Sequence, residues 1–425
     1  MNTPRYEVTR LDNGVTIATA AMPHMESACI GLWALTGSRH EEPKRNGIAH
    51  FVEHLLFKGT PTRTAYEISR QIEGIGASLD AFTTEDHTCY YTRGPAETLP
   101  AMADVLIDIY CNASFDPQEI EREREVVLEE ISMYRDNPSQ HVEDLLAAAA
   151  WPGHPMGLPI TGTEASVKRI KRGDIFSYHR QRYSGANTIV TVSGRIEHAA
   201  VVDLIGPLLQ SMIPGEPIPF APVPSHMAQS GPRRMDETRD VEQAHVCIGF
   251  HTFGRHDSRR YALKLLNVLL GENMSSRLFQ LLREESGLCY SVSSDAVTLE
   301  DVGLFSLYVG LDVDNVPRAL ELTAGCLREF GRKPVTRDLI SQALAYTIGQ
   351  SRISLESSLS QMMWIGESLM SYQRIIDPQE SFDRVSQVTA EEVREVAAEV
   401  FRPEGTAIAY IGSEVPEMAL DGFLG

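Results

Sequence analysis

The segment GIAHFVEHLLF, residues 47–57, sets three ionisable side chains in an otherwise apolar run. These are His50, Glu53 and His54. Residues three and four positions apart share one face of a helix, so all three side chains would project from the same side. Two imidazoles at this spacing can bind one zinc ion, and the carboxylate can take a proton from a zinc-bound water. The segment therefore predicts a hydrolytic zinc site on a helix.

The alternative interpretation of this segment is a pair of core histidines beside an ordinary glutamate. Burying three polar groups on one apolar helix without compensating partners would be costly, so the metal site is the favoured interpretation. The order H-x-x-E-H is also the signature of the inverzincin peptidases.

The segment EIEREREVVLEEISMY, residues 119–134, is the expected source of a third zinc ligand. A catalytic zinc site needs three protein ligands and one open position. Glu130 is the strongest candidate, because its helical neighbours three and four positions away carry no charge and direct it toward the core, where it needs a cation. Glu123 lies on a similar face and could orient a histidine. The other carboxylates are interpreted as a solvated face: Glu121, Glu125 and Glu129.

Five motifs together resemble the pitrilysin-type family of zinc peptidases, which includes insulin-degrading enzyme and the mitochondrial processing peptidase. The resemblance is closest to the small two-domain, processing-peptidase-like branch and runs through most of the chain. Four motifs lie in the first half and one in the second: GIAHFVEHLLFKGT, GASLDAFTTEDHTCYY, EREREVVLEEI, HPMGLPITGT and MSSRLFQLLREESGLCYSV.

The resemblance implies that three residues bind one Zn²⁺ per chain: His50, His54 and Glu130. It makes Glu53 the general base and Glu123 a supporting acid. The implied activity is that of a zinc metalloendopeptidase that cleaves peptides or unfolded precursor segments in an enclosed chamber. The alternative is a non-catalytic structural subunit of the same fold, as in respiratory complexes, but such members usually lack an intact metal motif.

In the second half, Arg283 and Tyr290 match an arginine–tyrosine pair of the family. The pair is expected to hold the substrate backbone and the tetrahedral oxyanion, since both side chains can donate hydrogen bonds to developing negative charge. The region equivalent to the zinc segment, near residues 263–269, contains no histidine. Two chains face each other in the resembled branch. The expected assembly is therefore a homodimer in which Arg283 and Tyr290 act in trans.

The stretch GASLDAFTT, residues 76–84, resembles the edge strand beside the zinc in this family. A peptide substrate adds to such an edge as an extra strand through main-chain hydrogen bonds. The residues expected to bind it are Asp80, Ala81, Phe82 and Thr83. Asp80 departs from the family pattern, where relatives often carry asparagine, and its charge would favour cationic substrates.

The elements that must position these residues repeat within the chain. Residues 29–32 (CIGL) recur as 247–250 (CIGF), and residues 80–86 recur as 295–301 at nearly the same offset. A proline-rich stretch between the halves resists regular structure and is typical of a linker. The predicted organisation is a catalytic domain over 1–212, a linker over 213–235 and an inactive repeat over 236–425.

Paired strands followed by long helices predict the fold class α+β. The expectation is two similar α/β sandwich-like domains, each a mainly antiparallel sheet with helices packed on one face. Asp116 is the expected N-cap of the helix that carries Glu130. Predicted strands cover residues 15–21, 28–36, 88–94, 244–252 and 303–309. Predicted helices cover residues 46–58, 65–75, 96–112, 117–135, 258–270, 275–285, 314–330 and 336–351.

The formal net charge of −20 argues against a nucleic-acid-binding protein, which needs a basic face. None of the six cysteines forms a C-x-x-C pair, so free and mostly buried thiols are expected. No apolar run reaches the roughly 18 residues of a transmembrane helix, and the N-terminus lacks a secretory signal. A bacterial cytoplasmic protein is expected, with a mature mitochondrial protein as the alternative.

Overall fold

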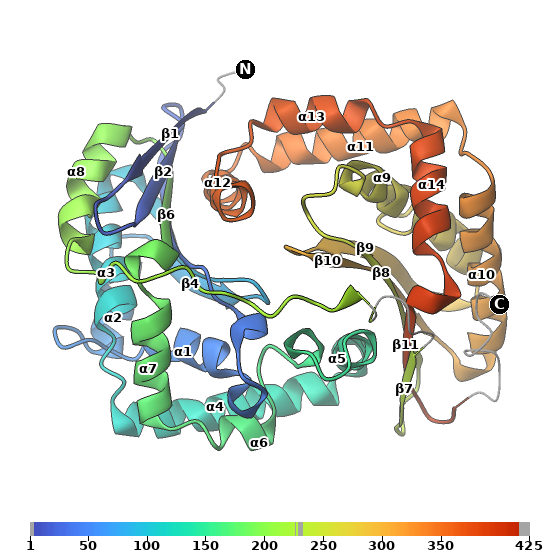
Figure 1. Cartoon of the computed structure of the whole chain (residues 1–425), viewed down its shortest axis with the longest axis horizontal. Helices are drawn as coiled ribbons and strands as arrows, with labels where there is room; N and C mark the ends of the chain where they lie inside the picture. Colours follow the sequence, from blue (N-terminus) through green and yellow to red (C-terminus); the bar gives the residue numbers. More distant parts are fainter. Residues whose placement is uncertain (1–3, 226, 228–232, 416–425) are drawn as a thin grey trace. The chain divides into compact units, whose positions relative to one another are not determined.

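The computed structural model describes residues 4–225, 227 and 233–415. The chain forms two units, each with its own sheet. Unit 1 comprises Met1–Ser132, Leu158–Ala221 and Arg352–Ile376, and unit 2 comprises Met133–Gly157, Pro222–Ser351 and Asp377–Gly425. Figure 1 labels the elements of both units.

Unit 1 is built on a six-stranded sheet with the order β1-β2-β6-β3-β5-β4. Neighbouring strands are antiparallel, except for the parallel pair of β2 and β6. Strand β4 pairs only with β5 and therefore forms one edge of the sheet. The strands are β1 (Arg5–Arg10), β2 (Thr16–Ala21), β3 (Ser27–Ala34), β4 (Ser78–Thr83), β5 (Thr88–Pro95) and β6 (Thr188–Gly194).

Both faces of this sheet are apolar, because alternate residues of β3 point to opposite faces. Ile30 and Leu32 join the main core of the unit, whereas Cys29 and Trp33 join a second cluster on the other face. The main core contains side chains of α1 (Ile48–Leu56), α3 (Leu99–Asn112) and α8 (His198–Leu209). The second cluster is closed by a single helix, α12 (Ser358–Tyr372).

Unit 2 follows the same plan with a five-stranded sheet of order β7-β11-β8-β10-β9. Its neighbours are antiparallel apart from the parallel pair of β7 and β11. Ile248 faces a core that includes α9 (Arg260–Leu270), α10 (Val316–Arg332) and α14 (Ala390–Val400), whereas Cys247 faces α5 (Pro138–Ala150). The strands are β7 (Arg233–Thr238), β8 (Ala244–Phe253), β9 (Cys289–Thr298), β10 (Val302–Leu311) and β11 (Thr406–Gly412).

Helices α5 and α12 are exchanged between the halves of the sequence. Helix α5 comes from the first half and covers the sheet of unit 2, while α12 comes from the second half and covers the sheet of unit 1. The predicted fold class is confirmed. The prediction placed helices on one face of each sheet, and the structure has a further helix on the second face. The contiguous domains predicted over 1–212 and 236–425 therefore do not coincide with the two packed units, because each unit borrows a helix.

The predicted elements are all present, and one differs in type. Residues 275–285 were expected as an α-helix, but Phe279–Glu285 form a π-helix, η7. Asp116 caps α4, since its carboxylate accepts a hydrogen bond from Gln118 N at 2.8 Å. The remaining helices are α2 (Ala65–Glu73), α4 (Pro117–Asp136), α6 (Glu164–Val167), α7 (Arg172–Arg182), α11 (Arg337–Ser354) and α13 (Pro378–Ser386).

The prediction of six free cysteines is confirmed, and Cys111 alone among them is not fully buried. Among the helices of the described residues, none combines the length and the apolar character that crossing a membrane would require.

The packing of α12 against the sheet of unit 1 can be tested at Gly366. A Cβ added there would lie 2.3–2.7 Å from ring atoms of Trp33. Gly366→Ala should therefore lower the free energy of unfolding by about 1–3 kcal/mol through overpacking. The measurement is urea unfolding followed by tryptophan fluorescence.

The matched control is Gly325→Ala, in the middle of α10, where an added Cβ meets no atom within 4 Å. This variant should gain up to about 1 kcal/mol from helix propensity. Equal stability of the two variants would contradict the packing of α12 against Trp33.

Candidate metal centre

Three predicted zinc ligands converge in unit 1. Helix α1 carries His50 and His54, and α4 carries Glu130. The Nε2 atoms of His50 and His54 lie 3.6 Å and 3.4 Å from Glu130 Oε2. One nitrogen or oxygen atom from each residue falls within 4.8 Å of the others, which is a spacing that one metal ion can bridge.

The cluster fits a zinc ion on its own geometry. Glu130 Oε2 and His50 Nδ1 are buried and lack a hydrogen-bond partner, so the carboxylate oxygen faces two imidazoles at distances too long for hydrogen bonds. A buried carboxylate without a partner is costly, and a cation between these atoms would satisfy it. Two imidazole nitrogens and one carboxylate oxygen form a donor set typical of catalytic zinc.

The electrostatics favour the metal-binding forms of His50 and Glu130, whereas His54 would have to release a proton as a metal ion binds. Burial, followed by the neighbouring His54, lowers the pKa of His50 to about 4, so its lone pair is available at neutral pH. Burial acts to lower the pKa of His54, but the adjacent Glu130 and the charge of Glu53 outweigh it, so the pKa is raised and protonation is favoured. The adjacent His54 lowers the pKa of Glu130 against the effect of burial, which favours the carboxylate.

Glu53 lies on α1 with the two histidines and contacts the edge strand β4. The hydroxyl of Thr83, at the end of β4, donates a hydrogen bond to Glu53 Oε2. Burial raises the pKa of Glu53, and the Thr83 hydrogen bond opposes that shift. A raised pKa suits a carboxylate that must take up a proton and later release it. Thr83, predicted only as a peptide-binding residue, therefore also orients Glu53.

Glu123 of α4 lies beside His54, the position that its predicted supporting role requires. Its Oε2 atom lies 3.3 Å from His54 Nδ1, so it can accept the Nδ1 proton and leave Nε2 directed toward Glu130. Lys58 Nζ contacts the other carboxylate oxygen of Glu123 at 2.8 Å. Sequence analysis missed Lys58. Its position four residues after His54 places it on the same helix face, which would have predicted a contact with the same partners.

Arg124 ties α4 to its surroundings. Its guanidinium donates to the carbonyl oxygens of Val167 and Ile170 and lies 5.3 Å from the ring centroid of Phe51 on α1. The side chain is 8% exposed, so this contact is part of the core. Arg124 therefore helps to hold the two ligand-bearing helices side by side.

Glu41 caps the helix that carries the two histidines. Its Oε2 atom accepts hydrogen bonds from Gly47 N at 2.7 Å and Asn46 Nδ2 at 3.1 Å, and its Oε1 atom accepts one from Ala49 N at 2.8 Å. Burial raises the pKa of Glu41 to about 8, against these three hydrogen bonds, which lower it. Gly47 has φ +89°, a conformation that favours glycine, and cannot cap the helix with a side chain of its own.

Sequence analysis missed Glu41 because it does not stand at the usual N-cap position. Helical N-caps are recognised from the residue next to the first turn, whereas Glu41 reaches the turn across a short 3₁₀ helix (Pro43–Arg45). Asn46 strengthens the same region, since its Nδ2 also donates to Pro159 O at 2.9 Å.

The predicted peptide-binding strand lies at the sheet edge. Residues Asp80 to Thr83 belong to β4, whose second edge has no strand partner among the described residues. The Asp80 carboxylate accepts hydrogen bonds from Ala81 N and from the Tyr91 hydroxyl. Phe82 packs against Trp33 with ring centroids 6.0 Å apart, so its side chain supports the strand from the α12 side.

Arg283 and Tyr290 belong to unit 2, whereas the metal cluster belongs to unit 1. Arg283 lies on the π-helix with its guanidinium 5.0 Å from the ring centroid of Phe279. Tyr290 lies in β9 and is 64% exposed. Within the described residues, His50, His54 and Glu130 form the one group of potential metal ligands found, and the predicted equivalent in unit 2 is the apolar helix α9.

Two family models and several relatives match this chain along most of its length. The model for "Insulinase (Peptidase family M16)" matches residues 16–164, and the model for "Peptidase M16 inactive domain" matches residues 169–346. An uncharacterized zinc protease of Mycobacterium tuberculosis is 36% identical over 402 residues, which cover 94% of this chain and 92% of that protein. The uncharacterized zinc protease YmxG of Bacillus subtilis is 34% identical over 401 residues, which cover 94% of this chain and 96% of that protein.

The fold has close counterparts among solved structures. A protease from Helicobacter pylori has a TM-score of 0.91 at 21% identity and covers 96% of this chain and 100% of its own. An M16-like peptidase described as putative, from Alicyclobacillus acidocaldarius, has a TM-score of 0.83 at 20% identity, with coverage of 96% and 98%. At these identities the likeness concerns the fold.

The cap on α1 can be tested with Glu41→Gln. Above its pKa of about 8, the Glu41 carboxylate offers two acceptor oxygens, whereas glutamine offers one. Its amide group would then face a backbone N–H of Gly47 or Ala49 and displace the first turn. Zinc affinity should fall by roughly 10- to 100-fold, the usual effect of losing a group that positions a ligand. The measurement is competition with a chromophoric chelator.

The matched control is Glu42→Gln at the adjacent position, where the side chain is 73% exposed and contacts Arg45 at 3.6 Å. This variant should bind zinc like the wild type. Unchanged zinc affinity in Glu41→Gln would show that the cap does not position the histidines.

Proposed function

The chain belongs to the insulinase family, peptidase family M16, and we propose that it is a zinc-dependent endopeptidase that cleaves peptides or unfolded precursor segments. The observation that carries the proposal is the convergence of two imidazoles and a carboxylate beside a second carboxylate, the half-buried Glu53. The names of the relatives support a zinc-dependent protease and leave the substrate open.

The proposed chemistry assigns one task to each group. His50, His54 and Glu130 would hold the ion, and bound zinc would supply a Lewis acid that acidifies water and polarises the scissile carbonyl. Glu53 takes the proton from the attacking water as its oxygen bonds to the carbonyl carbon. Glu53 then gives that proton to the amine nitrogen as the C–N bond breaks. Thr83 keeps the Glu53 carboxylate oriented through this cycle.

The substrate would bind by strand addition at β4. The unpaired edge of this strand presents backbone N–H and C=O groups to an extended peptide. The strand ends at Thr83, which bonds Glu53, so a peptide docked along Asp80 to Thr83 would run toward the general base. The carboxylate of Asp80 would favour a basic side chain in the peptide.

We propose a homodimer with one zinc per chain, in which Arg283 and Tyr290 stabilise the oxyanion at the site of the partner chain. One chain carries both the ligand cluster and the arginine–tyrosine pair, so a second kind of subunit is not needed for a complete set. A guanidinium and a phenol are suitable donors for developing negative charge. The chamber proposed to enclose the site would admit unfolded peptides. The cytoplasmic location stays a prediction.

The role of Glu53 can be tested with Glu53→Gln. The amide cannot take a proton from water, so peptide cleavage should fall by about 100- to 10,000-fold while one zinc per chain stays bound. Turnover is measured with a quenched fluorescent peptide, and zinc is measured by elemental analysis. Glu125→Gln, on the exposed face of α4, is the control and should keep wild-type turnover.

Either of two outcomes would reject this assignment: near wild-type turnover in Glu53→Gln, or a wild-type protein that binds zinc but cleaves no member of a random peptide library. The second outcome would favour the alternative of a non-catalytic structural subunit. The intact ligand cluster weighs against that alternative.

The trans arrangement can be tested by mixing two inactive variants, Glu53→Gln and Tyr290→Phe. Random exchange of chains makes about half of the dimers mixed, and each mixed dimer has one intact site in a symmetric assembly. Activity should therefore return to about a quarter of the wild-type value. Activity that stays at the level of the separate variants would exclude action in trans.

A further inference from the structure

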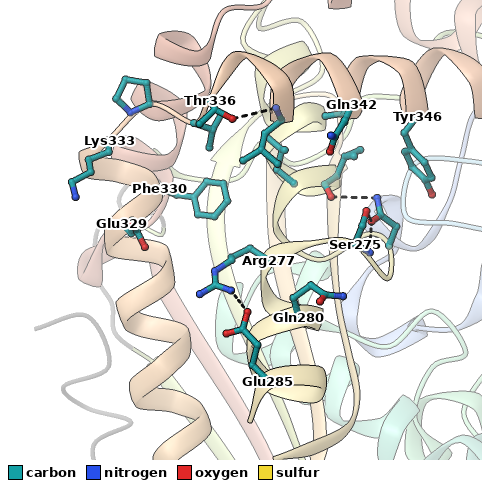
Figure 2. A pocket seen from close by; sticks show the side chains of 17 residues that line it. Ser275, Arg277, Gln280, Glu285, Glu329, Phe330, Lys333, Thr336, Gln342 and Tyr346 are labelled. Carbon is teal, nitrogen blue, oxygen red and sulfur yellow. Dashed lines mark hydrogen bonds and ion pairs between the residues drawn. The ribbon is translucent and has the colours of Figure 1, made fainter. Parts of the chain in front are cut away.

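Unit 2 contains a cavity of about 500 Å³ that has no part in the metal cluster (Figure 2). Its walls come from the end of α9, the segment around the π-helix η7, the end of α10 and the start of α11. All of its lining residues belong to unit 2, so the cavity is formed by this unit alone. Its volume lies in the range of roughly 300–1,000 Å³ that is typical of small-ligand sites.

The floor of this cavity is apolar and largely buried. Phe330 is 8% exposed, Val268 is 3% exposed and Ala343 is 3% exposed. Figure 2 shows the Phe330 ring directed from α10 into the space between Thr336 and Arg277. Such a floor suits an apolar side chain, whose burial is worth about 1.5–3 kcal/mol.

The rim carries charges of both signs. Arg277 and Glu285 form an ion pair at 2.8 Å, and the exposed Lys333 and Glu329 lie at the end of α10. A fatty acid or a nucleotide would bring negative charge alone and meet two carboxylates. Arg277 and Glu285 pair with each other, so Lys333 and Glu329 are the charges that a ligand would meet. A molecule with one negative and one positive end can match these two.

The remaining polar groups favour an amide-containing ligand. Gln280 and Gln342 line the cavity from η7 and α11. Gln280 Nε2 donates to Met274 O at 2.8 Å, so its carbonyl oxygen can accept from a peptide N–H, and the Gln342 amide can both donate to and accept from a peptide bond. We therefore propose that this cavity binds a short peptide with an apolar side chain and free termini. Such a molecule combines the apolar body, the amide groups and the two opposite charges that the lining matches.

The π-helix links this cavity to Arg283. Gln280 and Glu285 of η7 line the cavity, and Arg283 stands on the same π-helix stacked on Phe279. π-helices are rare, and their irregular turns occur frequently at functional sites. A bound peptide would contact η7 together with α10 and α11 and so fix the position of Arg283. This regulatory consequence depends on the proposed function, whereas peptide binding does not.

The test is isothermal titration calorimetry of the full-length, zinc-loaded Glu53→Gln variant with the tripeptide Leu-Leu-Leu. This background prevents cleavage during the titration. One saturable site per chain is expected. The same tripeptide with an acetylated N-terminus and an amidated C-terminus should bind roughly tenfold more weakly or worse, since both charge matches are lost.

The location of the site is tested by adding Leu339→Trp to the Glu53→Gln variant. Leu339 lines the cavity and is 42% exposed, so the indole ring would occupy part of the cavity. Binding should be lost. The control is Ile353→Trp, on the same helix but outside the cavity lining and 64% exposed, which should leave binding unchanged. Absence of saturable binding, retention of binding in Leu339→Trp, or equal binding of the blocked peptide would overturn the proposal.

A turnover assay separates this proposal from the proposed function. In the wild type, saturating Leu-Leu-Leu should change cleavage of a reporter peptide by roughly twofold or more, and this change should be absent in Leu339→Trp. Binding without any reporter cleavage would reject the peptidase while leaving the peptide site intact. Normal reporter cleavage without tripeptide binding would reject the peptide site while leaving the proposed peptidase function intact.

Discussion

A buried carboxylate facing two imidazoles is the constraint on which unit 1 depends. Glu130 Oε2 has no hydrogen-bond partner of its own and lies between 3.4 and 3.6 Å from His54 and His50. That arrangement is unfavourable without a cation, so two helices far apart in the sequence must be held at a fixed separation. Glu41 fixes the start of α1, and Arg124 fixes α4 against Phe51 and the segment at 167–170.

The same helices also set the chemistry of the second carboxylate. Glu53 lies one turn beyond His50, where burial raises its pKa and the hydroxyl of Thr83 holds it in place. Since Thr83 ends the edge strand, the group that would move the proton is linked directly to the strand that would bind the peptide. Glu123 and Lys58 complete a chain of polar contacts behind His54.

The two units show how one fold can carry two different tasks. Each has a sheet whose main face packs on several helices and whose second face is closed by a helix from the other half of the sequence. In unit 2 the helix that replaces the ligand helix is apolar, and the unit instead offers an exposed arginine, an exposed tyrosine and a separate cavity beside a π-helix.

The sequence by itself determined the fold class, and it predicted the group of His50, His54 and Glu130 that the structure brings together. The periodicity of residues 47–57 placed His50, Glu53 and His54 on one face, and the uncharged neighbours of Glu130 distinguished it from the other glutamates of its helix. These inferences depend on spacing within one helix, which follows from local geometry.

Only the tertiary structure decided the exchange of α5 and α12, the capping of α1 by Glu41 and the contact of Thr83 with Glu53. Each depends on which segments meet after folding: Trp33 accepts α12 because Gly366 lets the ring approach, and Glu41 reaches Ala49 across a short 3₁₀ helix. A sequence pattern records that a face must be buried. It does not record which distant segment buries it, because many apolar helices satisfy the same requirement and specific packing selects one of them.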